Sequence, residues 1–173
     1  MKRDLQELID AIAMNVSNKR YWHYPKKPMP CELDEDLNDL IDLFIESSPA
    51  ERDAIFRKID NNVAGALEAF SVRMAVWGAR QSSEDLLVRG GIALILEAGR
   101  VDIRDTMAVM PMLYHSALKI NADPGRIFSD AAAYYRSVVS DALLDFLKRT
   151  PHDRSLVAWG IEEVNGPEGI YYR

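Results

Sequence analysis

The chain has 173 residues and a net charge of −6, from 21 basic and 27 acidic side chains. This length and an ordinary apolar content predict one folded, water-soluble domain over residues 1–173. The negative charge argues against a protein that binds nucleic acid or an anionic membrane by general electrostatic attraction. The single cysteine, Cys31, excludes an internal disulfide and fits a cytoplasmic protein. The chain has neither the apolar core of a signal peptide at its start nor the roughly 20-residue apolar run of a membrane span.

Two amphipathic helices and a loop are predicted in the first part of the chain. Apolar residues three and four apart indicate a helix over residues 5–17. The next segment, YWHYPKKPMP at 21–30, holds three prolines, so we expect a loop whose aromatic side chains pack on the body of the protein. A second helix is predicted over residues 33–47. Its apolar stripe lies opposite an acidic stripe formed by Asp36, Asp39, Asp42 and Glu46.

A strong helix-start signal follows at SPAE, residues 48–51. Serine as N-cap, proline at the first helical position and glutamate three residues after the cap make a capping box. Large apolar residues then recur every seventh position without loss of phase, which predicts one long helix over residues 49–80. The recurring residues are Phe56, Val63, Phe70 and Trp77. The dipeptide at 81–82 then turns the chain.

Residues 83–99, SEDLLVRGGIALILEAG, are predicted to form the central helix of the core. The second half of this segment is apolar on every side, and a helix without a polar face must be covered all round. Each of Gly90 and Gly91 costs about 1 kcal/mol relative to alanine inside a helix. We therefore expect a neighbouring helix backbone to approach closely at this pair.

The rest of the chain predicts two more helices and a tail. Asp102 can cap a helix that runs to about residue 121 and is kinked at Pro111. Asp123 and Pro124 begin a last long helix that ends near residue 149, and residues 152–173 form either a hairpin or an extended strap. Short links favour antiparallel neighbours. The predicted fold is all-α, with about six helices in a bundle or in a short stack of antiparallel pairs.

One segment resembles a known family. Asp85-Leu86-Leu87-Val88-Arg89, followed by Ala93 and Leu94, is similar to the second helix of a HEAT-type repeat. In that family an Asp and an Arg near the turn pair along the stack of repeats. The resemblance covers one helix pair, residues 64–98. It implies HEAT-like helical layering and a protein-binding scaffold.

Catalytic signatures are missing from the sequence. It has no glycine-rich phosphate loop, no His-Glu-x-x-His and no Gly-x-Ser-x-Gly. Cys31 has no metal-ligand companion at a usable spacing. Carboxylates spaced by three, such as Asp36, Asp39 and Asp42, can hold a divalent metal only with ligands from a second helix, and the Glu-x-x-His pairs of di-metal bundles do not occur. We expect neither a cofactor nor a metal.

A second cluster consists of Arg73, Trp77 and Arg80, three and four residues apart on one side of a helix. Such a group can grip a carboxylate or phosphate against an aromatic platform. The alternative is that Trp77 fills the core while the arginines extend beside it or pair with Glu68 and Asp85. Both interpretations stay open on the sequence alone.

The charge distribution indicates how the protein works. Residues 34–60 carry nine acidic and three basic side chains, a surplus equal to the net charge of the whole chain. Such a patch attracts a basic partner and repels nucleic acid. The favoured hypothesis is a non-enzymatic protein–protein interaction module, such as an immunity-type inhibitor of a basic toxin, that docks through Asp36, Asp39, Asp42 and Glu46. The alternative is a small-molecule- or metal-binding bundle, or an enzyme, using Arg73 and Trp77 or the carboxylates. The oligomeric state stays open.

Overall fold

The computed structural model describes residues 3–17, 24, 27–98 and 109–133. These residues form an all-α bundle, as predicted, and no strand occurs among them. None of the helices in these ranges combines the length and apolarity that crossing a bilayer requires. The tail at 152–173 and the second half of the predicted last helix lie outside the described residues. The helices are α1 (Leu5–Ser17), α2 (Glu32–Glu46), α3 (Pro49–Lys58), α4 (Asn61–Gln81), α5 (Glu84–Ala98), α7 (Met110–Lys119) and α8 (Pro124–Ala133).

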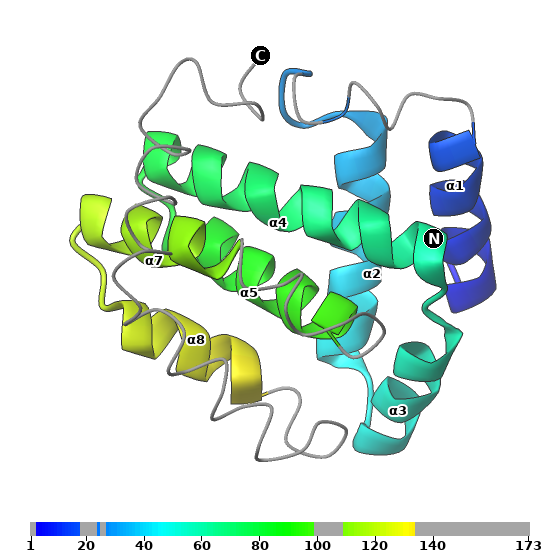
Figure 1. Ribbon diagram of the computed structural model, residues 1–173. Helices are drawn as coiled ribbons and strands as arrows, with labels where there is room; N and C mark the ends of the chain where they lie inside the picture. Colours follow the sequence, from blue (N-terminus) through cyan, green and yellow to red (C-terminus); the bar gives the residue numbers. More distant parts are fainter. Residues whose placement is uncertain (1–2, 18–23, 25–26, 99–108, 134–173) are drawn as a thin grey trace.

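Helices α4 and α5 form the centre of the bundle. They are joined by the two residues 82–83 and lie antiparallel (Figure 1). Helix α7 packs on both of them, and α8 packs on α5 and α7. Because α5 contacts α2, α4, α7 and α8, the apolar helix predicted to be central is covered on several sides. This confirms the interpretation of its sequence.

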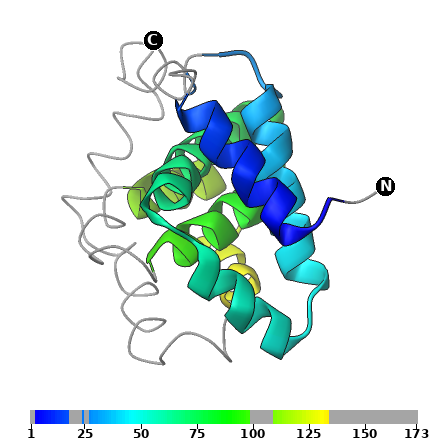
Figure 2. The ribbon, with the colours of Figure 1, turned by 90° about the vertical axis from the view of Figure 1, so that its right-hand side faces the viewer.

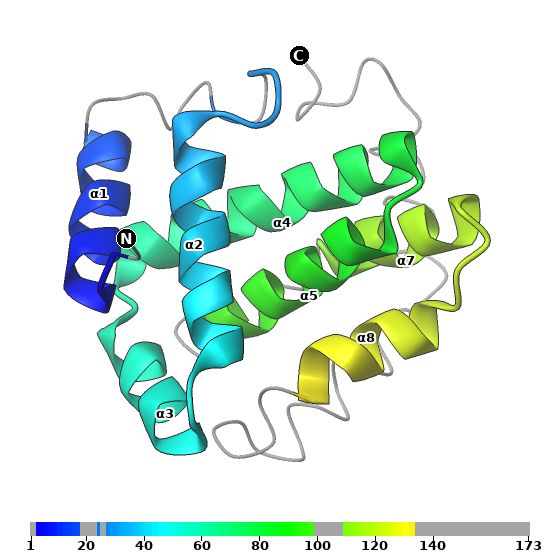
Figure 3. The ribbon, with the colours of Figure 1, turned by 180° about the vertical axis from the view of Figure 1, so that it is seen from behind.

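Helices α1 and α2 form a second antiparallel pair. Figure 3 shows them side by side, with α2 crossing α4 and α5. Figure 2 looks onto this end of the molecule and shows α1, α2 and α3 in front of the central helices. The outer surfaces of α1 and α2 therefore lie on one side of the bundle.

The prediction of one helix over residues 49–80 is wrong. Helix α3 starts at the predicted capping box, where Ser48 and Glu51 exchange two hydrogen bonds of 3.3 Å. It ends at Lys58, and the extended backbone of Ile59 leads to Asp60, whose carboxylate accepts from the Val63 N–H at 3.0 Å and caps α4. The apolar phase survives this break because Ile55 of α3, Ile59 and Val63 of α4 enter the same core.

The kink predicted at Pro111 is also wrong. Helix α7 begins at Met110, so Pro111 lies in the first helical turn, where its missing N–H costs no intrahelical bond. Residue 102, the predicted cap, lies outside the described residues. The start predicted for the next helix is confirmed, because the Asp123 carboxylate accepts from the Gly125 N–H at 2.9 Å immediately before the first turn of α8.

Close helix approach explains the two glycines of α5. A Cβ added at Gly90 would lie 2.9 Å from the Cβ of Met74 on α4 and 2.9 Å from a methyl of Leu113 on α7. A Cβ at Gly91 would lie 3.0 Å from the Cβ of Ala131 on α8. Both positions therefore pack against neighbouring helices, as predicted from the sequence.

Candidate functional site

A buried ion pair connects the start of α2 to the middle of α4. Arg73 and Asp34 have relative exposures of 1% and 0%. The Arg73 Nε donates to Asp34 Oδ1 at 2.9 Å, and Nη2 donates to Oδ2 at 2.6 Å. This two-point geometry is the strongest form of the arginine–carboxylate interaction. It fixes the crossing of α2 over α4 at one place.

The same pair holds the loop that precedes α2. The Tyr24 hydroxyl donates to Asp34, and Arg73 Nη1 donates to the carbonyls of Tyr24 at 2.8 Å and Lys27 at 2.7 Å. The guanidinium lies 4.7 Å from the centre of the Tyr24 ring, a cation–π distance. Tyr24 is 1% exposed, which confirms at this residue that the aromatic loop packs on the body.

The protonation of this cluster indicates a structural role. Burial raises the pKa of Tyr24 well above its ordinary value, and the Asp34 charge raises it further. Burial acts to lower the pKa of Arg73, but the hydrogen bonds and charge of Asp34 outweigh it and raise that pKa. Burial also raises the pKa of the Cys31 thiol, which is the opposite of what a nucleophilic cysteine needs. The cluster therefore keeps Tyr24 neutral and Arg73 charged.

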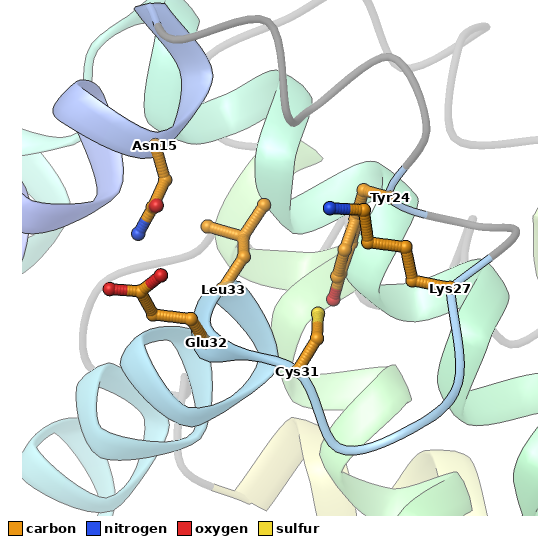
Figure 4. Close-up of a pocket in the computed structure, with 6 residues that line it drawn as sticks. All are labelled: Asn15, Tyr24, Lys27, Cys31, Glu32 and Leu33. Carbon is orange, nitrogen blue, oxygen red and sulfur yellow. The ribbon is translucent and has the colours of Figure 1, made fainter.

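A crevice of about 50 Å³ lies beside this cluster (Figure 4). Cys31 lies next to the Tyr24 ring there, and the volume suffices for a few water molecules but not for an organic substrate. The crevice thus gives no support to small-molecule binding at this place. Its lining residues are Asn15, Tyr24, Lys27, Cys31, Glu32 and Leu33.

The predicted docking residues have three different surroundings. Asp36 is buried, where it accepts from Asn15 Nδ2 at 2.8 Å and pairs with Arg3 at 2.7 Å. Asp39 is exposed and pairs with a second nitrogen of Arg3 at 2.8 Å. For Asp36, the expectation of an outward-facing carboxylate is therefore wrong, because this side chain is buried and bound by Arg3 and by Asn15 of α1.

The other two members of the stripe lie nearer the end of α2. Asp42 is half-buried and pairs with Arg89 of α5 at 2.5 Å, and Arg89 also donates to Asn38 at 3.1 Å. Glu46, at the last position of the helix, is exposed. Asp36, Asp39 and Asp42 thus connect α2 to other parts of the chain, and the side chains of Asp39 and Glu46 are exposed.

Helices α1 and α2 together carry nine acidic residues and no lysine, arginine or histidine. Arginines from outside the pair, namely Arg3, Arg73 and Arg89, are bound to four of these carboxylates. Six of the nine acids are exposed, including Asp39, which also pairs with Arg3, and these six are called the acidic face below. They are Glu7, Asp10, Glu32, Glu35, Asp39 and Glu46.

The other predicted cluster is divided by burial. Arg73 is inside the core with Asp34, whereas Arg80 is exposed and lies 5.1 Å from the ring of the half-buried Trp77. The structure therefore does not bring the two arginines together around one anion. Of the two carboxylates expected to pair with them, Asp85 interacts with Arg89 at 3.3 Å.

Comparisons with protein-family models, curated proteins and solved structures give no match to this chain. The acidic face is therefore the candidate site on its geometry and charge alone. Within the described ranges, no group of three or more His, Cys, Asp and Glu side chains is placed to hold a metal ion.

Sequence reasoning missed the residues that neutralise the stripe. Arg3 is one of three consecutive charged residues near the chain start, Lys2 to Asp4, and nothing local relates it to Asp36. Asp34 carried a usable signal, because it follows Leu33 on the apolar side of α2 and a carboxylate there needs a buried cation. Arg73 offered the complementary signal, a cation among the buried apolar residues of α4.

Proposed function

We propose that the protein is a non-enzymatic interaction module whose acidic face docks a basic partner protein, as an immunity-type inhibitor docks on its toxin. The observation that carries the proposal is the composition of the α1–α2 pair, which holds nine acidic and no basic residues. Since α1 and α2 lie side by side, their exposed carboxylates act on an approaching partner together.

The pairing of the other acids supports a surface role for the exposed ones. The three arginines bind Asp34, Asp36, Asp39 and Asp42, so the carboxylates needed for helix packing already have cations. A helix pair that needed only internal ion pairs would not need Glu35 and Asp10 on its outside. Like charges on one surface repel one another, and a basic partner removes that cost.

The alternative functions have less support in the described part of the chain. A small-molecule site or enzyme needs a concave pocket with converging polar groups, and the crevice at Cys31 holds only a few waters. The HEAT-type resemblance of the α4–α5 pair stays a prediction. It is compatible with the proposal, because a HEAT-like scaffold also works by binding another protein.

Charge reversal on matched pairs of sites tests the proposal. The test variant is Asp10→Lys with Glu35→Lys, and the control is Asp130→Lys with Glu84→Lys. All four residues are exposed, Glu35 and Glu84 both lie in the first turn of a helix, and the change in net charge is the same in the two variants. The control also removes the surface ion pair between Glu84 and Arg126 (2.5 Å), so circular dichroism first checks that both variants are folded. Each tagged protein is incubated with extract of the source cells, and bound proteins are identified by mass spectrometry. The association rate with the recovered partner is then measured at low and high salt.

We expect the wild type and the control to retain one basic protein that the test variant loses. Association should slow steeply with salt, because exposed charges more than about 10 Å apart are screened at ~0.1 M. If both double variants retain the same proteins at the same rates, the acidic face is not the docking surface.

A further inference from the structure

Arg3 lies just outside the first helix. Asp4 caps α1, since its carboxylate accepts from the Glu7 N–H at 2.9 Å and its own N–H donates to the Glu7 carboxylate at 3.1 Å. The buried residues Leu8, Ile9 and Ile12 attach the helix itself to the core. Arg3 can therefore leave its partners by side-chain rotation, while the cap and the buried face of α1 stay in place.

The Arg3 guanidinium bridges two carboxylates one turn apart on α2. Nη1 lies 2.7 Å from Asp36 Oδ1, and Nη2 lies 2.8 Å from Asp39 Oδ2. The side chains of Arg3 and Asp39 are 35% and 54% exposed, whereas that of Asp36 is 7% exposed. The bridge thus runs from a buried oxygen to the surface of the acidic face.

We propose that Arg3 occupies the place that an arginine of the partner takes, so that the chain carries an internal competitor for its own docking surface. This inference rests on the proposed function. Because Asp36 is buried, losing Arg3 without replacement would leave a buried charge whose one other donor among the described residues is Asn15. Arg3 is therefore released when another guanidinium enters, and the exchange keeps Asp36 paired.

The geometry also selects the entering group. Two different nitrogens of one planar guanidinium reach the two carboxylates, and a lysine ammonium is a single point charge that cannot reproduce this fork. The partner residue at this position is accordingly an arginine. Lysines can contribute to attraction elsewhere on the acidic face, but they do not replace Arg3.

Peptide probes measure this competition without the natural partner. Nona-arginine and nona-lysine are titrated against the wild type, Arg3→Gln and the control Arg57→Gln by fluorescence anisotropy at low salt. Arg57 pairs with Asp53 on α3, and its loss changes the net charge by the same amount. Arg3→Gln should bind nona-arginine about two- to fivefold more tightly than Arg57→Gln, the range set by a partly exposed ion pair. The affinity for nona-lysine should rise equally in both variants.

A second variant keeps the proposal testable if Arg3→Gln does not fold. Asp39→Asn alters an exposed residue and should reduce the preference for nona-arginine over nona-lysine, whereas the matched change Asp10→Asn should weaken both peptides alike. Equal gains in nona-arginine affinity for Arg3→Gln and Arg57→Gln would overturn the proposal that Arg3 is an internal competitor, and so would an unchanged peptide preference in Asp39→Asn. The docking proposal would survive either outcome if the wild type binds the peptides. If neither peptide binds any variant, both proposals fail.

Discussion

The α1–α2 and α4–α5 pairs are both antiparallel, but different chemistry holds each of them in place. At α4–α5, backbones approach closely at Gly90, and the Ser71 hydroxyl donates to the Gly90 carbonyl at 2.8 Å across the contact. At α1–α2, apolar contacts are supplemented by Arg3 and Asn15 reaching Asp36. The α4–α5 contact depends on the small volume at Gly90, whereas the α1–α2 contact combines apolar packing with charge.

Under the proposed function, this difference assigns a fixed core to α4–α5 and the docking surface to α1–α2. A contact between small buried residues does not respond to salt or to a passing cation, so α4–α5 can serve as a fixed centre. A contact made by arginines at the edge of an acidic helix pair responds to both. The carboxylates of α2 thus stabilise the fold and create the surface charge at the same time.

The largest effect is expected where charge is buried most deeply. Arg73→Met should lower the free energy of unfolding by about 3–5 kcal/mol, because Asp34 would remain buried without its cation. Urea denaturation followed by circular dichroism measures the change. The exposed control Arg57→Met should stay within about 0.5 kcal/mol of the wild type. A loss below about 1 kcal/mol in Arg73→Met would mean that water reaches Asp34.

The next effect tests the close contact between α4 and α5 at Gly90. Gly90→Ala gains about 1 kcal/mol of helix propensity but forces a new carbon to within 2.9 Å of the Met74 Cβ, which is fixed to its backbone. We expect a net loss of about 1–2 kcal/mol in the same denaturation assay. Gly91→Ala, whose Cβ would contact the Ala131 Cβ at 3.0 Å, should cost less, because the Cβ at Gly90 would meet two atoms at the shorter distance of 2.9 Å. If Gly90→Ala is the more stable of the two, the close approach is not at Gly90.

The two pairs also differ in how far the sequence predicts them. The role of Gly90 follows from local information, since an apolar helix with glycines in its middle indicates close packing. The bounds of α1, α2 and α5 follow from periodicity and capping in the same way. The boundary at Ile59 does not, because the apolar phase continues across it and only the extended backbone reveals the break.

The acidic stripe shows more clearly what a single sequence cannot predict. Spacing on α2 correctly grouped Asp36, Asp39 and Asp42 on one side of the helix. Their surroundings depend on Arg3, which pairs with Asp36 from 33 residues away, and on Arg89, which pairs with Asp42 from 47 residues away. Pairing over such separations depends on how the helices cross, and a single sequence contains no direct signal for it.

A third effect appears at alkaline pH. The pKa of Tyr24 is raised in the folded protein, so above pH ~10 the unfolded chain loses this proton while the folded chain keeps it. The unfolded state then binds fewer protons, and stability falls with rising pH by up to about 1.4 kcal/mol per pH unit until the folded pKa is reached. Tyr24→Phe should make the decline shallower than in the wild type. Parallel declines would place the Tyr24 hydroxyl in water.

The smallest effect should distinguish a charged contact of α2, the one with α5, from the uncharged α4–α5 contact by their response to salt. Asp42 and Arg89 connect α2 to α5 at 2.5 Å, but the Asp42 side chain is 45% exposed, so solvent screens the pair. Asp42→Asn should therefore cost about 0.5–1 kcal/mol at low ionic strength, and most of that loss should disappear near 0.5 M NaCl, where the screening length is only about 4 Å. The loss in Gly90→Ala should be the same in both buffers, because no charge is involved. Urea denaturation of both variants at the two salt concentrations makes the comparison directly. A loss in Asp42→Asn that salt leaves unchanged would show that this carboxylate acts through packing, like the α4–α5 contact. The contacts of α2 would then not respond to charge as a docking surface for a basic partner requires.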